Sequence, residues 1–343
     1  MRKKTEMDLQ AFLRHYPDLG HADAPALGLC LEALVAAGLD RLPRPAGGAT
    51  LQRWQALARV AGHDLGLCKL YEGHTDALAI MQELDCTVAP GTTWGTWAAE
   101  PPRARVQADA DGPHCRLRGT KAWCSGAAVL SHALLTAWDS AGRQRLVAVA
   151  LDQPGVQVER GGWQAVGMAN TDSRQVRFDQ ARGHWVGGPD DYLQRPGFWQ
   201  GAMGIAACWL GAAQAIALPL REHCAKHDEP HAQAHLGAVD SALHQAACVL
   251  RHSARQLDQA PDADCQLLAR RTRAVTEASV DSLLRHVGRA LGAGPYCLDR
   301  HFARLLADLP VFIRQSHAER DLAQLGQQLA GEAAAADRGG WCL

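Results

Sequence analysis

An α+β fold, made of a helical part, a β part and a second helical part, is predicted by the order of hydrophobic patterns along the chain. Up to about residue 90 apolar residues recur at three- and four-residue spacing, as at Leu51, Trp54 and Leu57, which indicates helices. From residue 94 to 185 the pattern changes to short alternating runs separated by Gly, Pro and Asp, which indicates strands. Long helical runs then return. Because helices and strands are not interleaved, nothing indicates a Rossmann domain.

These changes of pattern divide the chain into an N-terminal part, 1–92, a middle part, 93–190, and a C-terminal part, 191–343. The middle part should hold about eight strands in a small barrel or sandwich. Its strand candidates are Val106 to Ala108, Cys115 to Trp123, His132 to Trp138, Leu146 to Leu151 and Gln175 to Phe178. The C-terminal helices are predicted at Gly201 to Lys226, His231 to Leu257, Asp264 to Leu291 and from Glu319 to Ala336.

Composition excludes some classes of function. The 343 residues include 35 Lys and Arg against 36 Asp and Glu, so no basic field exists to hold phosphate backbones and we expect no nucleic-acid partner. The 11 cysteines are scattered without a Cys-x-x-Cys pair, and no apolar stretch follows the charged N-terminus. This pattern predicts reduced thiols in a cytoplasmic protein.

An uncharged run from Gly197 to Leu220 is long enough to span a bilayer. It is rich in Ala and Gly, contains Gln200, Gln214 and Pro219, and stands alone in the chain. A helix that is apolar all round can also be buried inside a bundle. We favour the buried helix and expect no membrane partner.

Two segments of the middle part carry the strongest functional signal. Residues 119–126 read GTKAWCSG and residues 167–179 read GMANTDSRQVRFD. The Trp-Cys-Ser turn at a strand end offers an aromatic plane, a hydroxyl and backbone N–H groups. These groups suit the ring and N5 edge of an isoalloxazine, so we interpret the turn as part of a flavin site.

Together the two segments resemble the middle β-domain of the acyl-CoA dehydrogenase family. Upstream of them, WGTWAAEP at 94–101 resembles the family's Thr-Glu-Pro flavin loop, with Ala99 in place of Thr. Downstream, LGAGPY at 291–296 resembles its Gly-Gly-x-Gly-Tyr turn. Residues 37–48 and 59–66, followed by His74, are similar to its N-terminal helical domain. The order and spacing of these matches extend over most of the chain.

The resemblance implies a helical domain, a β-barrel domain and a C-terminal helical bundle, assembled as a homodimer or homotetramer. It also implies FAD, with FMN as the alternative cofactor, and a small-molecule substrate for which acyl-CoA is a candidate. Three functions follow from it. The first is oxidation at a CH–CH group of an acyl thioester. The second is monooxygenation by a flavin enzyme on the same fold. The third is a family member without turnover.

Cofactor-binding residues are implied by the same matches. Trp123 and Ser125, with Cys124 between them, match the Lys-x-Trp-Ile-Thr segment that lines the flavin in relatives. The alternative interpretation is an aromatic strand residue packed in the β-core, followed by a turn serine. Ala99 and Glu100 match the flavin loop, where Ala99 would act through its N–H. The complete set is Ala99, Glu100, Trp123, Cys124, Ser125, Thr171, Arg289 and Gly292.

Thr171, Arg289 and Gly292 belong to more ambiguous matches. Thr171 opens a Thr-Asp-Ser turn similar to the family's Ser-Asp-Thr turn near cofactor and substrate, and such residues also form ordinary loops. Arg289 stands where relatives have Gln, three residues before Gly292 of the glycine turn. Its guanidinium could bind a pyrophosphate. Arg289 is equally interpretable as a solvated helix residue.

Other segments depart from the family. Pro102 to Arg105 replaces a Gly-Ser-Asp loop on the acyl thioester side, which argues against ordinary acyl-CoA recognition. Relatives also carry an Arg-x-x-Phe-Gly segment whose Arg reaches the FAD pyrophosphate of a neighbouring subunit. The run from Arg221 to Pro230 has no Phe-Gly.

The largest departure concerns the catalytic base. Many relatives place Glu in an Ile-Tyr-Glu-Gly-Thr run, and the corresponding residues 313–317 read IRQSH. Gln315 therefore occupies the base position, and an amide cannot accept the α-proton. His317, Glu319 or Asp321 could replace it. Alternatively, these three residues form a polar helix start with acidic side chains at its favourable end.

A histidine repeat, His223, His227, His231 and His235, has the four-residue spacing of a metal site on one helix. Pro230 interrupts that helix. We therefore expect a helix end and a loop here, and no metal.

Overall fold

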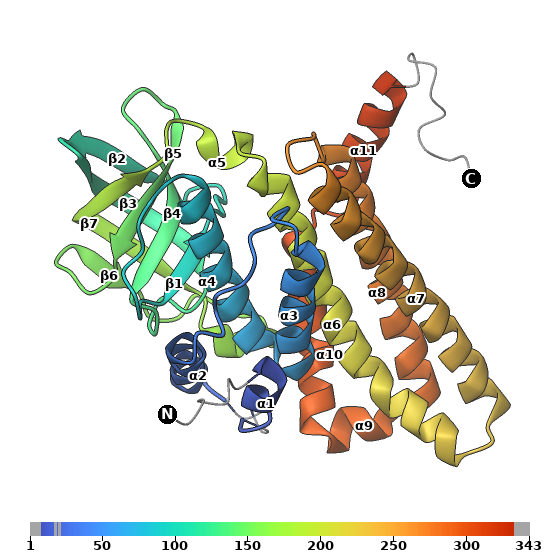
Figure 1. Cartoon of the computed structure of the whole chain (residues 1–343). Helices are drawn as coiled ribbons and strands as arrows, with labels where there is room; N and C mark the ends of the chain where they lie inside the picture. Colours follow the sequence, from blue (N-terminus) through green and yellow to red (C-terminus); the bar gives the residue numbers. More distant parts are fainter. Residues whose placement is uncertain (1–7, 17–18, 20–21, 333–343) are drawn as a thin grey trace, which may run out of the picture.

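The computed structural model describes residues 8–16, 19 and 22–332 (Figure 1). The N-terminal helices are α1 (Leu9–Leu13), α2 (Ala24–Ala36), α3 (Thr50–His63) and α4 (Leu65–Glu83). The strands are β1 (Trp94–Trp97), β2 (Val106–Asp111), β3 (His114–Cys124), β4 (His132–Trp138), β5 (Gln144–Ala150), β6 (Val156–Val158) and β7 (Arg174–Val186). A short turn of 3-10 helix, η2 (Ala169–Thr171), precedes β7.

The remaining elements are helical, as expected from the sequence. They are α5 (Asp191–Gln194), α6 (Gly197–Lys226), α7 (Pro230–Gln259), α8 (Gln266–Leu291), α9 (Ala293–Leu298), α10 (Arg300–Phe312), η3 (Ile313–Gln315) and α11 (Glu319–Glu332). The predicted α+β class is therefore confirmed. The part of the last predicted helix beyond Glu332 lies outside the described residues. The short helix α9 and the helix α10 were not predicted.

The middle strands form a sheet that closes on itself. The strand order is β1-β4-β2-β3-β7-β5, and β5 pairs with β4 as well as with β7, so β4, β2, β3, β7 and β5 close into a small barrel with β1 paired to β4 beside it. The described residues hold seven strands, not the eight or so expected. One reason is that the run from Arg174 to Val186 is a single strand of 13 residues.

Helix α6 lies inside the helical bundle and packs against α3, α7, α8 and α10. Its contact with α3 is close, because a Cβ on Gly211 would stand 2.0 Å from the carbonyl oxygen of Ala58. Among the described residues α6 is the one helix long and apolar enough to cross a membrane, but 72% of its most apolar window is buried inside the protein. Such burial is typical of a core helix.

The histidine repeat is divided between two helices. Helix α6 ends at Lys226 and α7 begins at Pro230, so the four side chains do not share one helix face. His223 stacks on His227, with ring centroids 4.5 Å apart. His235 instead contacts His286 of α8. Within the described part of the chain no three His, Cys, Asp or Glu side chains are grouped to hold a metal ion.

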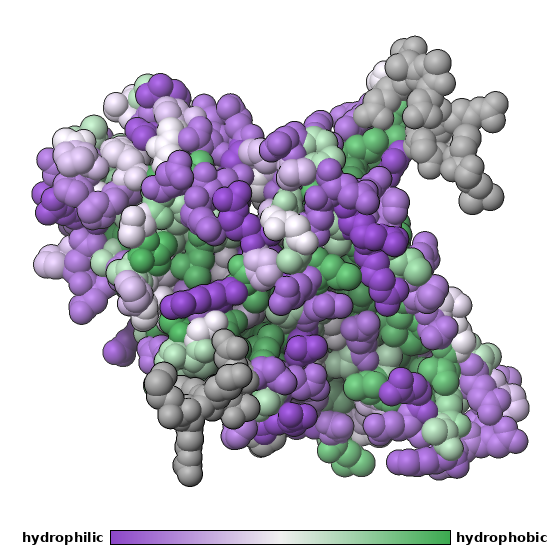
Figure 2. Space-filling view, in the orientation of Figure 1, coloured by the Kyte–Doolittle hydropathy of each residue, from purple (hydrophilic) through white to green (hydrophobic). Residues whose placement is uncertain are grey.

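Figure 2 shows hydrophilic side chains over most of one face of the molecule, with apolar side chains visible where the β-domain meets the helices. Helix α4 lies at this junction, since it packs against β1 on one side and against α3 and α6 on the other. The junction is where the candidate site lies.

Candidate functional site

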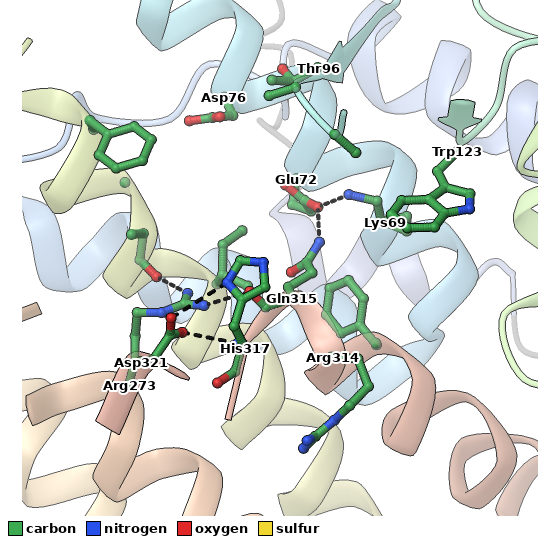
Figure 3. A pocket seen from close by; sticks show the side chains of 18 of the residues that line it. Lys69, Glu72, Asp76, Thr96, Trp123, Arg273, Arg314, Gln315, His317 and Asp321 are labelled. Atoms are coloured by element: carbon green, nitrogen blue, oxygen red, sulfur yellow. Dashed lines mark hydrogen bonds and ion pairs between the residues drawn. The ribbon is translucent and has the colours of Figure 1, made fainter. Parts of the chain in front are cut away.

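A cavity of about 1220 Å³ lies between the β-domain and the helical bundle (Figure 3). One wall comes from β1, the end of β3 and η2, and the other from α4, α5, α6, α8, the end of α10, η3 and the start of α11. Pockets for single small ligands commonly measure roughly 300–1,000 Å³. The cavity is therefore large enough for a cofactor and a substrate together.

The wall formed by the β-domain depends on a bulge at the end of β3. Lys121 pairs with Val176 and Cys124 pairs with Arg174, so β3 has one more residue than β7 over this stretch. Trp123 lies in the bulge with a φ of 57°. Its side chain is 58% exposed and lines the cavity. The bulge thus turns an indole away from the strand core and toward the cavity.

The two motif segments meet directly behind Trp123. The N–H of Gly126 donates to the carbonyl oxygen of Thr171 at 2.8 Å. The hydroxyl oxygens of Ser125 and Ser173 are 2.7 Å apart, and those of Thr171 and Ser173 are 2.9 Å apart. Ser125, Thr171 and Ser173 all line the cavity. The result is a cluster of hydroxyl groups that can donate to or accept from a polar ring edge.

Cys124 does not contribute its side chain to the cavity. The residue is completely buried in the β-barrel core, where its thiol lies 3.4 Å from the carbonyl oxygen of Lys121. Burial raises the pKa of the Cys124 thiol far above its usual range. The thiol therefore stays neutral. Alternation along β3 explains the difference from its neighbours, because adjacent strand residues point to opposite faces.

Glu100 anchors the loop after β1. Its carboxylate accepts hydrogen bonds from Trp138 Nε1 at 2.8 Å, from Thr136 Oγ1 at 2.8 Å and from Lys121 Nζ at 3.2 Å. Burial lowers the pKa of Lys121, and the Glu100 charge opposes that shift. With its carboxylate so engaged, Glu100 fixes the loop, while Ala99 lines the cavity without any polar side chain.

The helical wall presents charged residues that the sequence interpretation missed. Lys69, Glu72 and Asp76 follow one another on one face of α4 and line the cavity. Glu72 is only 5% exposed and forms an ion pair with Lys69. Burial alone would lower the pKa of Lys69, but the Glu72 carboxylate reverses this and the net shift is upward. Charges at three- and four-residue spacing within a mostly buried helix were the available signal.

Gln315 approaches Glu72 from the opposite end of the chain. Its Nε2 lies 3.4 Å from Glu72 Oε1, and its buried Oε1 has no hydrogen-bond partner in the described structure. Its backbone carbonyl accepts from Arg273 Nη2 at 2.9 Å. Arg273 is held in turn by the carbonyl of Ala202 and by the face of Trp209. The backbone of Gln315, which the resemblance assigns to the family's base position, is therefore held in place, and the residue lines the cavity.

His317 and Glu319 lie at the rim. His317 lines the cavity, but its side chain is 57% exposed and its Nδ1 is 3.4 Å from Asp321 Oδ1. The backbone N–H of His317 donates to Asp321 Oδ2 at 3.0 Å. Glu319 is exposed, begins α11 and does not line the cavity. These contacts are those of a polar helix start.

Arg289 and Gly292 lie away from this cavity. Both are exposed at the C-terminal end of α8, whereas Arg273 and Glu277 line the cavity from its N-terminal half. With a rise of about 1.5 Å per residue, the 12 residues from Glu277 to Arg289 span roughly 18 Å. The cofactor-binding role of Arg289 and Gly292 stays a prediction.

The middle-domain model of the acyl-CoA dehydrogenase family, "Acyl-CoA dehydrogenase, middle domain", matches residues 92–181. This stretch includes the Trp123 bulge and the hydroxyl cluster. The chain has the acyl-CoA dehydrogenase fold. Three solved structures with that fold superpose on nearly the whole chain, and their identities of 17–18% show the fold alone. No protein with a curated record matches the sequence.

FMN-bound TdsC of Paenibacillus sp. A11-2, a dibenzothiophene monooxygenase, has a TM-score of 0.80 at 18% identity, with 94% of this chain and 95% of TdsC covered. The methanesulfinate monooxygenase MsuC of Pseudomonas fluorescens has a TM-score of 0.78 at 18% identity, with 94% and 97% covered. A nitrososynthase of Micromonospora carbonacea var. africana has a TM-score of 0.77 at 17% identity, with 96% of each chain covered.

Proposed function

We propose that this protein is a flavin-dependent monooxygenase that oxygenates a small organic molecule. The observation that carries the proposal is Gln315, whose amide lines the cavity beside Glu72 at the position that the resemblance assigns to the family's Glu base. Monooxygenation by reduced flavin and O₂ does not need a carboxylate there. The similarity in fold to the monooxygenases TdsC and MsuC supports the same interpretation.

The cavity wall of the β-domain fits an isoalloxazine. The exposed indole of Trp123 offers a flat apolar surface to the ring. The hydroxyl groups of Ser125 and Ser173 lie beside it, and the loop at Ala99 is held in place through Glu100. The Trp97 Nε1–H donates to the carbonyl of Ser125 at 3.2 Å and stabilises this turn.

We propose FMN as the cofactor, in place of the FAD that the resemblance implied. The run from Arg221 to Pro230, at the end of α6 and in the loop that follows, has no Phe-Gly segment of the kind that positions an Arg toward the FAD pyrophosphate in relatives. TdsC, which shares the fold, has been crystallised in complex with FMN and indole together. A homodimer or homotetramer in the cytoplasm remains part of the proposal.

When bound, the reduced flavin would supply two electrons to O₂, so that one oxygen atom enters the substrate and the other leaves as water. The protein's own residues would bind and orient the flavin and the substrate, and would exclude water from the cavity. Trp163, Phe198, Trp199 and Phe312 give the cavity apolar walls, which favours a largely apolar substrate. Arg273, which also donates to the carbonyl of Ala202, would hold the backbone of Gln315 in place while the substrate occupies the cavity.

Titration of the purified protein with FMN and FAD tests cofactor binding, and we expect quenching of FMN fluorescence with the tighter affinity for FMN. The reduced holoprotein is then mixed with isotopically labelled O₂ and a panel of aromatic and heteroaromatic compounds that includes indole. Mass spectrometry should find the label in a product. A holoprotein that reoxidises without transferring label to any member of a broad panel would contradict monooxygenation.

Acyl-thioester dehydrogenation is the second candidate, because one observation favours it. The Glu72 carboxylate lies within 3.4 Å of the Gln315 amide, so a carboxylate is present beside the family's base position although it comes from α4. Anaerobic mixing of the oxidised holoprotein with acyl-CoAs distinguishes the two functions. Rapid loss of the flavin's visible absorbance in wild type, slowed about 10²–10⁴-fold in Glu72→Gln, would establish dehydrogenation.

A further inference from the structure

Lys69, Glu72 and Gln315 form a connected group, here called the charge trio, on the helical side of the cavity. Figure 3 shows Glu72 joined both to Lys69 and to Gln315. Lys69 and Glu72 are one turn apart on α4, whereas Gln315 belongs to η3 at the other end of the chain. The Lys69 side chain carries a positive charge, the Glu72 side chain carries a negative charge and the Gln315 side chain is neutral. The net charge of the trio is therefore zero.

Lys69 also lies beside the wall that suits the flavin. It lines a small hollow next to the main cavity together with Thr96, Trp97 and Ser125. Its ammonium group stays protonated, because Glu72 moves the pKa of Lys69 upward. A fixed positive charge and its counter-charge are thus held within the space between α4 and the hydroxyl cluster.

We propose that the charge trio sets the reduction potential of the bound flavin, with Gln315 keeping its net charge at zero. This inference rests on the proposed function, since it requires a flavin in the cavity. Charges near the ring nitrogens are among the protein's principal means of tuning a flavin. The ring gains negative charge on reduction, so a nearby cation favours the reduced form and a nearby carboxylate opposes it.

The location of the trio makes these charges effective. Glu72 is 5% exposed, and a bound flavin would displace water from the cavity. In such surroundings the effective dielectric constant is far below that of water, so a unit charge acts strongly over several ångströms. An ionised Glu at position 315 would give the trio a net negative charge and would stabilise the oxidised flavin.

A purely structural role is the alternative. Pairs of Lys and Glu three residues apart also stabilise helices on exposed surfaces. The Lys69 and Glu72 pair differs because it faces a cavity and because Glu72 also contacts a residue 243 positions away. A structural pair would change the stability of α4 on mutation but would leave the flavin potential unaltered.

The experiment measures the midpoint potential of the FMN-loaded protein at mildly alkaline pH, where the reduced ring is anionic. Lys69→Met and Gln315→Glu should both lower the potential, and Glu72→Gln should raise it. The double variant Lys69→Met with Glu72→Gln restores a net charge of zero and should return close to wild type. Each single change should alter the ratio of affinities for oxidised and reduced FMN about tenfold, equivalent to roughly 30 mV for a two-electron couple.

Two controls separate charge from structure. Lys69→Arg keeps the charge and should leave the potential near wild type. Arg116→Met removes a cation from the exposed pair with Asp111 on the β-domain and should have no effect. If Lys69→Met does not fold, the opposite shifts expected for Glu72→Gln and Gln315→Glu still test the inference.

The outcomes distinguish this inference from the proposed function. Binding of FMN with potentials that do not move, or that move in one direction for all three single variants, would overturn the role of the trio alone. Failure of FMN and FAD to bind at all would overturn the proposed function and this inference together. Opposite shifts with a compensated double variant would support both.

Discussion

The two walls of the cavity differ in how closely they follow the acyl-CoA dehydrogenase family. The wall from the β-domain keeps the Trp-Cys-Ser turn, with Trp123 facing the cavity and Ser125 in the hydroxyl cluster. The helical wall has Gln315 at the position that the resemblance assigns to the family's Glu, and Glu72 of α4 lies beside it. Under the proposed function, the wall suited to a cofactor is retained and the wall that would face a substrate differs from the family. Fold alone therefore does not fix the reaction.

The comparison predicts that the motif glycine of the β-domain is required for the wall to form. Gly119 has a φ of 113°, and a Cβ there would stand 2.2 Å from the carbonyl oxygen of Arg105. Gly119→Ala should lower the free energy of unfolding by roughly 2–4 kcal/mol, since backbone strain and overlap both contribute. Urea denaturation measures this loss.

Gly112→Ala is the matched control for Gly119→Ala. Gly112 also has a positive φ, of 62°, but nothing lies within 4 Å of the added Cβ. Gly112→Ala should lower the free energy of unfolding by less than Gly119→Ala does, by about 1–2 kcal/mol. Equal losses at the two glycines would show that backbone conformation, and not the close approach to Arg105, explains the motif glycine.

Trp123 should matter for flavin affinity and little for stability. Its side chain is 58% exposed, so Trp123→Ala removes little buried area. Loss of aromatic stacking worth about 0.5–1.5 kcal/mol should weaken FMN binding by roughly 2–10-fold. Fluorescence titration measures this change. Trp185→Ala, which removes a β-domain indole packed on Arg145 outside the cavity, should leave the affinity unaltered. An unchanged affinity in Trp123→Ala would remove the role assigned to this residue.

Asp308 connects the two walls, and its titration predicts how their contact depends on pH. The carboxylate accepts from the backbone N–H of Met168 and pairs with Arg304, yet burial raises its pKa above the usual value. Because the pKa of Asp308 is higher in the folded than in the unfolded protein, protonation of its carboxyl group stabilises the folded state. This contribution to the free energy of unfolding is fully present at acid pH and is lost as pH rises through the pKa of the folded state.

Asp308→Asn should therefore become more stable relative to wild type as pH rises from acid toward neutral. The amide retains an acceptor for Met168 and does not ionise. Urea unfolding of both proteins across that pH range checks the slope. A stability difference that does not vary with pH would mean that burial does not disfavour ionisation of Asp308.

The smallest effect is expected at the rim of the helical wall. His317 is largely exposed and contacts Asp321 at the start of α11. His317→Ala should change the free energy of unfolding by no more than about 0.5 kcal/mol, and should leave FMN affinity at the wild-type value. Loss of oxygenation with unchanged FMN binding in this variant would instead place His317 in the reaction, as the sequence alone allows.

Local pattern was sufficient for much of the fold. The change from helical to strand periodicity near residue 94 and the return to helices were visible in the sequence, and the buried α6 followed from an apolar run containing Gln200 and Pro219. The Trp123 and Ser125 turn could be recognised because a motif at the end of one strand is encoded by adjacent residues. These features depend on interactions within a few positions of the chain.

Only the tertiary structure decided which side chains share the cavity. Alternation along β3 turned Cys124 into the core while the bulge turned Trp123 outward, and one residue of register makes that difference. Arg289 lies away from the cavity because it is at the far end of the long helix α8. Glu72 and Gln315 meet across 243 positions because α4, α6 and α10 pack against one another. Periodicity is a local property of a sequence, whereas such a contact depends on how whole helices pack.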